Sequence, residues 1–376
     1  MTQVMAYPVR EKRSLEVPAA QLPPRILGIG TATPDNSYSQ QEVLDYFGID
    51  DTRIRSTFFN SAIERRFLTL PPVVDGEPRT ESQGELLSKH RTQGINMGGR
   101  ALFDCVASIG AALTDIGYLA CVTSTGFLTP GFSALLVKEL GLRQDIGRVD
   151  VVGMGCNAGL NGLNAVAGWA RANPGKLAVM ICIEASSAAY VFDDTMRTSV
   201  VNSLFGDGAA AVAVMADADL CTDGLVPAGP APAILKFNSC VISDAIDAMR
   251  YDWDDEHGKF SFYLDRDVPY TVGAHAELVI DGLLAGTSLR RSDIQHWVIH
   301  SGGKKVIDSV MVNLGLSRYD VRHTTQVLRD YGNLSSGSFL FSLQRLLREK
   351  SVQPGDFGVL MTMGPGSTIE TALVRY

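Results

Sequence analysis

Three polar side chains that could take part in acyl chemistry stand at separate points of the 376-residue sequence, each beside glycines. The first is Cys156, in the segment GMGCNAG, which follows a short apolar run and precedes a helix predicted to begin at about Asn157. Unpaired N–H groups and the dipole at a helix N-terminus favour an anion, so this position would lower the pKa of the thiol and make it a nucleophile. The alternative is a structural cysteine in a tight strand-to-helix turn.

The other two candidates are His300 and Asn333. His300 ends a short apolar run and precedes Gly302 and Gly303, and reactive groups in α/β folds lie at the carboxyl ends of strands. Asn333 lies in a loop rich in Gly and Ser before a predicted helix. Asn is a favoured N-cap residue there, but its amide could also donate to a developing oxyanion. A thiolate, an imidazole and an amide suit a carbon–carbon-forming acyltransferase and a cysteine hydrolase equally, so both classes stay open.

Alternating strands and helices must position these residues. Short apolar runs predict buried strands at 26–30, 118–122, 149–152, 177–183, 209–215, 297–299 and 358–362. Capping residues, first-turn prolines and apolar periodicity predict helices at 39–47, 96–112, 130–140, 157–172, 199–204, 271–284, 304–314 and 335–349. This alternation predicts an α/β fold in layers, with a mostly parallel sheet.

The sequence also contains a faint internal repeat. FGDGAAAVAV (205–214) and MGPGSTIETALV (363–374) are both G-x-G turns that lead into apolar strands, and each closes one half of the chain. We therefore expect two similar halves, at 25–228 and 229–376, after a mobile N-terminal arm at 1–24. The Gly-, Pro- and Ala-rich segment 223–233 is the expected joint between them.

Composition excludes several classes of function. A formal net charge of −8 and a pI of about 5.3 disfavour a nucleic-acid-binding surface. The longest apolar runs fall short of the roughly 18 residues that suggest a membrane span, and the N-terminus lacks the apolar region of a secretory signal. The six cysteines show no spacing typical of a metal site, which favours free thiols in a reducing cytoplasm and no bound metal.

Five motifs resemble, in order and spacing, those of the thiolase-fold condensing enzymes. The motifs are GMGCNAG, LFGDGAAA, HSGGKKVIDS, YGNLSSGS and MGPGST. They are most similar to the type III polyketide synthases of the chalcone synthase group, whose early Arg-Arg segment resembles IERRFL at 63–68. The resemblance runs from about Arg25 to the C-terminus. It implies a thiolase-like, five-layer αβαβα fold built from two duplicated halves, and a homodimer.

Within that group, four segments resemble a bacterial branch that makes a C8 dihydroxyphenylacetyl thioester, an antibiotic precursor, from malonyl-CoA. These segments are TSTGFLTPG, GMGCNAGLN, DAMRYDW and MTMGPGSTIE. The implied reaction is a decarboxylative Claisen condensation on a cysteine thioester, with CoA thioesters as substrates and no metal or redox cofactor. The alternatives are a synthase that makes another resorcinol or a pyrone from a different acyl-CoA starter, a Cys-His-Asn thioester hydrolase, and a non-catalytic partner protein of the same fold.

The resemblance also implies roles for individual residues. Cys156 would carry the acyl chain, and His300 would hold its thiolate as an ion pair and, with Asn333, face the thioester carbonyl. The residues implied to contact substrate are two aromatic gatekeepers, a glycine loop and one basic residue: Phe205, Phe262, Gly364, Gly366 and Arg53. Ser56 and Asn60 stand where plant members have further basic residues for the CoA phosphates, and the neighbouring Arg55 is an alternative basic residue for that role.

Overall fold

A computed structural model of the chain describes residues 22–193, 195–216 and 225–376. Most of the expected N-terminal arm at 1–24, and the first two residues of the expected joint at 223–233, lie outside the described residues. In the described part of the chain, no helix is both long enough and apolar enough to cross a bilayer.

The central feature of the described chain is a nine-stranded sheet with the order β13-β14-β15-β10-β1-β9-β8-β6-β7. Its strands are β1 (Arg25–Ala32), β6 (Ile116–Thr123), β7 (Gly147–Val152), β8 (Leu177–Glu184), β9 (Gly208–Met215), β10 (Ala233–Val241), β13 (His296–Ile299), β14 (Phe357–Gly364) and β15 (Thr368–Arg375). The apolar runs of the sequence predicted all of these except β10, whose side chains are mostly only partly buried.

The two parts of the sheet repeat one topology. In the first, β1 is antiparallel to β9, β9 is antiparallel to β8, and β8 is parallel to β6. In the second, β10 is antiparallel to β15, β15 is antiparallel to β14, and β14 is parallel to β13. The expectation of a mostly parallel sheet was wrong. The G-x-G turn at 364–366 folds β14 directly back onto β15, and a short connection of this kind can only give an antiparallel pair.

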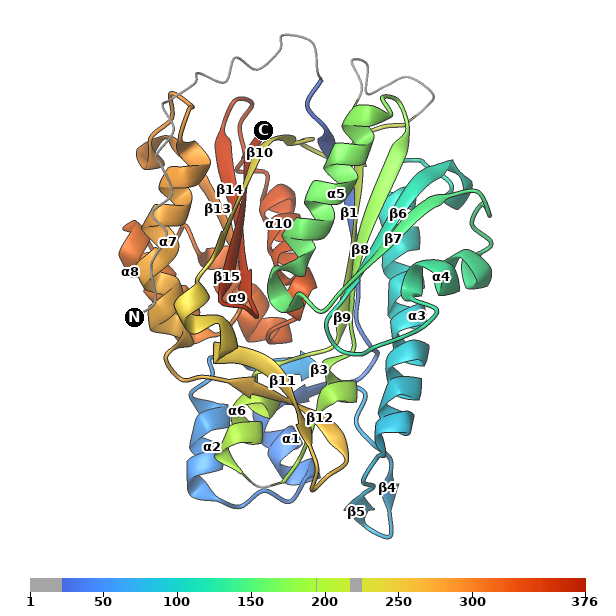
Figure 1. The fold of residues 1–376 in the computed structure, drawn as a ribbon, viewed down its shortest axis with the longest axis vertical. Coiled ribbons are helices and arrows are strands. Elements are labelled where there is room, and N and C mark those ends of the chain that lie inside the picture. The colour runs from blue at the N-terminus through green and yellow to red at the C-terminus, as the bar shows by residue number, and fades with distance from the viewer. Residues whose placement is uncertain (1–21, 194, 217–224) are drawn as a thin grey trace, which may run out of the picture.

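Helices lie between and outside the two parts of the sheet, which gives five layers (Figure 1). The inner layer contains α5 (Ala158–Ala172) and α10 (Ser338–Glu349), whose apolar side chains share one core with inward-facing residues of both sheet parts. One outer layer contains α3 (Gln83–Ala107) and α4 (Phe132–Leu140), and the other contains α7 (Val268–Leu284) and α8 (Lys304–Leu314). The predicted αβαβα fold is confirmed.

Smaller elements gather at one end of these layers (Figure 1). They are β2 (Ser37–Ser39), α1 (Gln40–Tyr46), α2 (Thr52–Phe59), β3 (Arg65–Phe67), α6 (Met196–Leu204), β11 (Met249–Asp254) and β12 (Lys259–Leu264). The sequence did not predict α2 or α9 (Arg322–Tyr331), which contain few apolar residues. It placed the long helix before β6 at 96–112, whereas a capping box between Ser82 and Glu85 begins α3 at Gln83.

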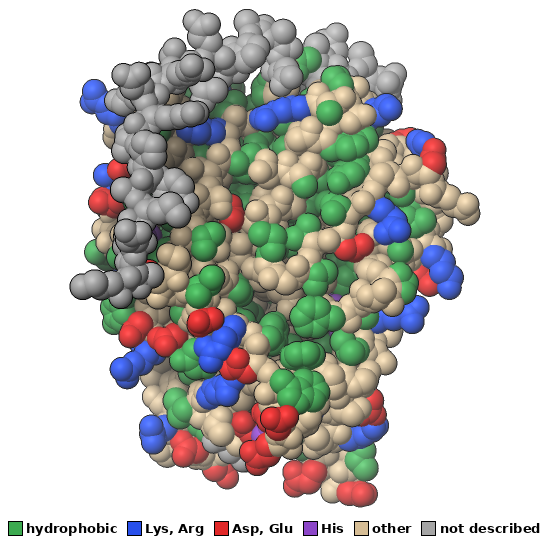
Figure 2. Space-filling view, in the orientation of Figure 1, with side chains coloured by type: hydrophobic (Ala, Val, Ile, Leu, Met, Phe, Trp, Pro, Cys, Tyr) green, Lys and Arg blue, Asp and Glu red, His purple; other side chains and the backbone are tan. Residues whose placement is uncertain are grey.

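Hydrophobic and charged side chains are unevenly distributed over the molecular surface. On the face shown in Figure 2, hydrophobic side chains gather along the middle, and Lys, Arg, Asp and Glu lie mainly toward the margins. Exposed large hydrophobic residues include Phe127, Val152, Trp253 and Phe260. The rings of Phe127 and Trp253 both lie within 6 Å of that of Phe260, at centroid distances of 5.7 and 5.2 Å.

Candidate active site

Cys156 lies in a single 3-10 turn, η2 (Gly155–Asn157), between β7 and α5. Gly155 has φ +74°, and a Cβ there would stand 2.3 Å from Cδ of Pro365, so only glycine fits this turn. The side chain of Cys156 is almost enclosed, with 8% exposure. The sequence placed the thiol correctly at a strand-to-helix junction.

The surroundings of Cys156 do not produce the lowered pKa expected from the helix N-terminus. Burial raises the pKa of the thiol to about 12, and hydrogen bonding with Ser335 and Asn333 opposes this only in part. The Sγ atom lies 3.3 Å from Oγ of Ser335. Desolvation of the charged form outweighs the helix end here, because the thiol is almost fully removed from water.

His300 follows β13, and its backbone N–H donates to the carbonyl of Met361 at 2.8 Å. Its side chain is 2% exposed, and burial lowers the pKa of the imidazole to about 3. Nδ1 has no hydrogen-bond partner among the described residues. Gly302 leaves room for the ring, because a Cβ at that position would lie 3.0 Å from Cδ2 of His300. Burial therefore opposes charge on the thiol and on the imidazole alike, while both side chains line one cavity.

Asn333 is held by its backbone beside the end of α6. Its N–H donates to the carbonyl of Leu204 at 2.8 Å, and its own carbonyl accepts from Gly206 at 3.0 Å. The side-chain oxygen accepts from the N–H of Ser335 at 2.8 Å, so Nδ2 is the donor that the amide turns toward the cavity. Nδ2 donates to the carbonyl of Gly302 at 3.3 Å, next to the loop that carries His300. The amide donor therefore faces the histidine loop.

Two cavities meet at the thiol. The larger, of about 430 Å³, is lined by Cys156, His300 and Asn333 together, so the structure brings all three predicted residues to one space. The smaller, of about 310 Å³, is largely apolar. Four residues line both cavities and therefore lie between them: Cys156, Phe205, Met249 and Phe262.

The two predicted gatekeepers form an aromatic pair at this boundary. The rings of Phe205 and Phe262 lie 5.9 Å apart at 88°, an edge-to-face arrangement. Phe205 directly follows α6, and Phe262 lies on β12. Fully buried Arg66, from the IERRFL segment, donates to the carbonyl of Phe205 at 2.8 Å and so fixes the backbone of the first ring.

The remaining predicted contacts have different positions. Gly364 packs on the turn of the nucleophile, since a Cβ there would stand 2.9 Å from the N atom of Cys156. Gly366 has φ +75° in the turn between β14 and β15. Arg53 lies exposed on α2 and is not among the lining residues of either cavity. Its neighbour Arg55 donates to the carbonyl of Ile49 and to the side chain of Gln41, and it is not among the lining residues of either cavity.

The sequence analysis missed a buried acid beside the thiol. Glu184 ends β8 and is fully buried, and burial raises its pKa to about 7. Its carboxylate accepts from Oγ of Ser124 at 3.0 Å and from Oγ of Ser336. Oγ of Ser124 also lies 2.7 Å from Oγ of Ser335, which completes a chain of polar groups from Glu184 to Cys156. The available signal was an acidic residue at the end of the otherwise apolar run LAVMICIE.

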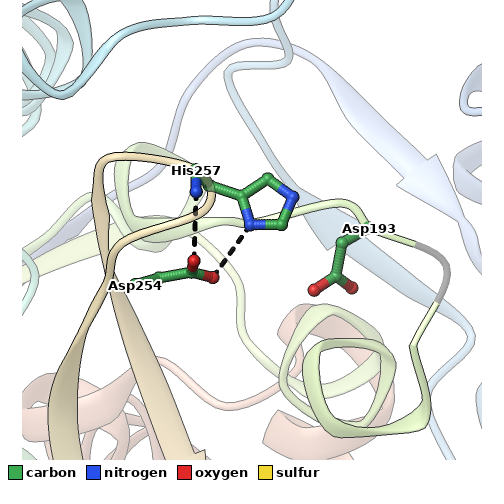
Figure 3. A group of neighbouring side chains, drawn as sticks. All are labelled: Asp193, Asp254 and His257. Atoms are coloured by element: carbon green, nitrogen blue, oxygen red, sulfur yellow. Dashed lines mark hydrogen bonds and ion pairs between the residues drawn. The ribbon is translucent and has the colours of Figure 1, made fainter.

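A separate cluster contains Asp193, Asp254 and His257, whose possible ligand atoms lie within 4.8 Å of one another (Figure 3). Nδ1 of His257 is 2.9 Å from the carboxylate of Asp254, and Asp193 accepts from the hydroxyl of Thr195 at 2.9 Å. None of these residues lines either cavity at the thiol. The hydrogen bond between Asp254 and His257 lies within the turn of the β11–β12 hairpin, whereas those of Asp193 lie within the segment that leads into α6.

Comparison with known proteins gives matches to two family models. Residues 12–218 match the family model for the N-terminal domain of chalcone and stilbene synthases, and residues 253–376 match the model for the C-terminal domain. The chain is 62% identical to 3,5-dihydroxyphenylacetyl-CoA synthase from Streptomyces toyocaensis, over 100% of this chain and 96% of the relative. It is 64% identical to the enzyme of the same name from Amycolatopsis balhimycina, over 94% and 93%. The crystal structure of PKS-I from the brown alga Ectocarpus siliculosus is similar, with a TM-score of 0.84, 26% identity and coverage of 96% and 100%.

Proposed function

Since the chain belongs to the chalcone and stilbene synthase family and is a type III polyketide synthase, we propose that it condenses malonyl-CoA into 3,5-dihydroxyphenylacetyl-CoA. The observation that carries this proposal is the meeting of a thiol, an imidazole and an amide in one cavity that adjoins a second, largely apolar one. The identity of 62–64% to synthases of that name, over nearly the whole chain, supports the product.

The first step loads an acyl group onto Cys156. His300 takes the proton of the Cys156 thiol, and the imidazolium and the thiolate stabilise each other as the sulfur attacks the thioester carbonyl. The C–S bond to CoA then breaks, and the CoA thiolate leaves with the proton that His300 returns. The acyl chain remains on Cys156 as a thioester.

The second step extends the chain. The thioester oxygen of a malonyl-CoA in the larger cavity faces His300 and Asn333, which stabilise negative charge on that oxygen. The bond to the carboxylate breaks, carbon dioxide leaves, and the enolate carbon attacks the carbonyl carried by Cys156. The sulfur departs as the new carbon–carbon bond forms. None of these electron shifts needs a metal or a redox cofactor.

The smaller cavity provides space for the growing chain, and its apolar walls exclude the water that would hydrolyse it. Ser124 and Ser335 line this cavity and connect it with Glu184, whose pKa of about 7 allows it to give or take a proton near neutral pH. Ring closure and aromatisation of a linear polyketide move protons. We assign that role to the chain from Glu184 to Ser335.

Incubation of the full-length protein with malonyl-CoA as the sole substrate, followed by mass spectrometry, tests the proposal. We expect a C8 dihydroxyphenylacetyl product and release of labelled carbon dioxide. A product that forms only after addition of a long-chain or aromatic starter would contradict it and favour another resorcinol or a pyrone. Free acid without carbon dioxide release would instead indicate a thioester hydrolase.

The protein is proposed to act as a homodimer in the cytoplasm. Hydrophobic side chains gather along the middle of the face in Figure 2, which supports a partner surface. The exposed aromatic cluster of Phe127, Trp253 and Phe260 supports it as well. The cysteines that the structure describes are free thiols, which, like a CoA substrate, suit a reducing compartment. Light scattering coupled to size-exclusion chromatography should give twice the chain mass, and a monomer at micromolar concentration would refute the dimer.

A further inference from the structure

We propose that Arg266, Lys304 and Lys305 bind the phosphate groups of the CoA thioester, and that Arg53 does not. This inference rests on the proposed function, because it concerns how that substrate is bound. Arg266 lies in the segment between β12 and α7, and the two lysines begin α8. All three line the larger cavity at the thiol.

The larger cavity runs from the protein interior to its surface. At its inner end, Cys156, His300 and Asn333 are no more than 8% exposed. Lys304 and Lys305 are exposed, and so is Arg266. A CoA thioester has its reactive carbonyl at one end and its phosphates at the other. With the carbonyl at Cys156, the nucleotide end must lie toward the mouth, where these three cations are.

The helix expected to bind the phosphates offers neutral groups instead. Ser56, Thr57 and Asn60 of α2 line the same cavity, and none of them carries a charge. Arg53 is not among the lining residues, and the guanidinium of Arg55 is engaged elsewhere. Among the described residues that line this cavity, the cations at its mouth are therefore Arg266, Lys304 and Lys305.

These cations are available to an anionic ligand. Lys304 is paired with Asp308 at 2.7 Å, and Arg266 lies 3.9 Å from Asp267, but all four side chains are well exposed. Exposed ion pairs contribute little to stability, so a phosphate can replace the carboxylate. Asp265 also lines the cavity. Its carboxylate already accepts from the hydroxyl of Tyr263 at 3.0 Å and from the N–H of Asp267 at 2.8 Å.

Calorimetric titration of the full-length protein with CoA, and separately with pantetheine, tests the assignment. Pantetheine has the same thiol arm and no phosphate. Lys305→Ala and Arg266→Ala should each raise the Kd for CoA about three- to tenfold and leave the Kd for pantetheine unchanged. Added salt should weaken binding of CoA more than binding of pantetheine. Lys138→Ala on α4 removes an exposed lysine of the same charge and should leave both constants unchanged.

The proposal is overturned if neither variant changes the Kd for CoA, if both ligands lose affinity equally, or if Arg53→Ala weakens CoA binding as much as Lys305→Ala does. These results do not depend on turnover. A protein that makes a different product from malonyl-CoA would contradict the proposed function while leaving the phosphate assignment intact. Formation of the C8 product by the wild type, together with an unchanged Kd for CoA in both variants, would support the proposed function and contradict the phosphate assignment.

Discussion

In the first half of the fold the chain enters the inner helix α5 through the 3-10 turn η2, and in the second half it enters α10 through the 3-10 turn η7 (Ser335–Gly337). The middle residue is Cys156 in the first turn and Ser336 in the second. Both turns lie against the inner core between the sheet parts. The same backbone arrangement thus presents a thiol in one half and hydroxyl groups in the other.

The hydroxyl groups of the second turn form hydrogen bonds with residues of the first half of the fold. Ser335 contacts the sulfur of Cys156 at 3.3 Å, whereas Ser336 donates to Glu184, which ends a strand of the first half. A duplicated scaffold therefore divides the work between its copies. One turn holds the nucleophile, and its counterpart supplies the polar groups that offset part of the burial of that nucleophile and of the acid beside it.

Replacing the central residue of each turn by alanine should give the largest difference in activity, because one residue carries the acyl chain and the other only supports Glu184. Cys156→Ala removes the atom that carries the acyl chain, so we expect product formation from malonyl-CoA to fall by at least about 10³-fold. Ser336→Ala removes one donor to Glu184 and should lower the rate by no more than about tenfold. Product yield by mass spectrometry measures both. Equal losses would refute the division of roles, and unchanged yield in Cys156→Ala would refute the nucleophile.

A second test concerns the donor that the second half provides to the substrate. Asn333→Asp keeps an oxygen that can accept from the N–H of Ser335 but removes the amide donor that faces the histidine loop. Loss of one preorganised oxyanion donor typically costs about 10²–10³-fold in kcat. We expect a fall in kcat for condensation of that size, with folding retained by circular dichroism. A change in KM alone would show that Asn333 binds substrate without stabilising the enolate.

A third test uses Glu184, the buried acid that accepts a hydrogen bond from Ser336 of the second turn. Burial raises the pKa of Glu184 from 4.5 to about 7, so the folded protein binds this proton more tightly than the unfolded chain does. Its contribution to stability is therefore full below about pH 4.5 and falls as the pH rises to about 7, by up to about 3 kcal/mol. Glu184→Gln cannot ionise and should lose less stability between about pH 5 and about pH 8. Urea unfolding of both proteins measures this, and equal losses would show that Glu184 is already ionised at the lower pH.

The comparison of the two turns also shows which parts of the site could be predicted from the sequence. The sequence located Cys156, His300 and Asn333 because each stands at a strand-to-helix or loop-to-helix junction beside glycines, and it located the strands because apolar runs are local. It did not locate Glu184, whose partners Ser124 and Ser336 come from elements far apart in the chain. It also gave the wrong direction for the pKa of Cys156, because burial depends on the packing of both halves and outweighs the helix end.

The smallest expected effects are on the free energy of unfolding, and they come from one glycine close to each turn, Gly159 in α5 and Gly337 in η7. A Cβ on Gly159 of α5 would stand 2.3 Å from the carbonyl oxygen of Ser336, a backbone atom that cannot move without shifting η7. A Cβ on Gly337 would have its nearest contact at 3.4 Å, with Cβ of Cys182, which is ordinary packing. Gly159→Ala should lower the free energy of unfolding by about 1–3 kcal/mol, whereas Gly337→Ala should change it by no more than about 1 kcal/mol.

Chemical denaturation of the two variants checks this pair, and kcat adds a second measurement. Because Gly159 is the point where the nucleophile's helix touches the opposing turn, its alanine variant should also displace Ser335 from Cys156 and lower kcat, while Gly337→Ala keeps the wild-type rate. If both variants unfold at the same denaturant concentration as the wild type, the two turns do not pack as closely as the 2.3 Å approach requires. The hydroxyl contact to the thiol would then have to be held by the loop of Asn333 alone.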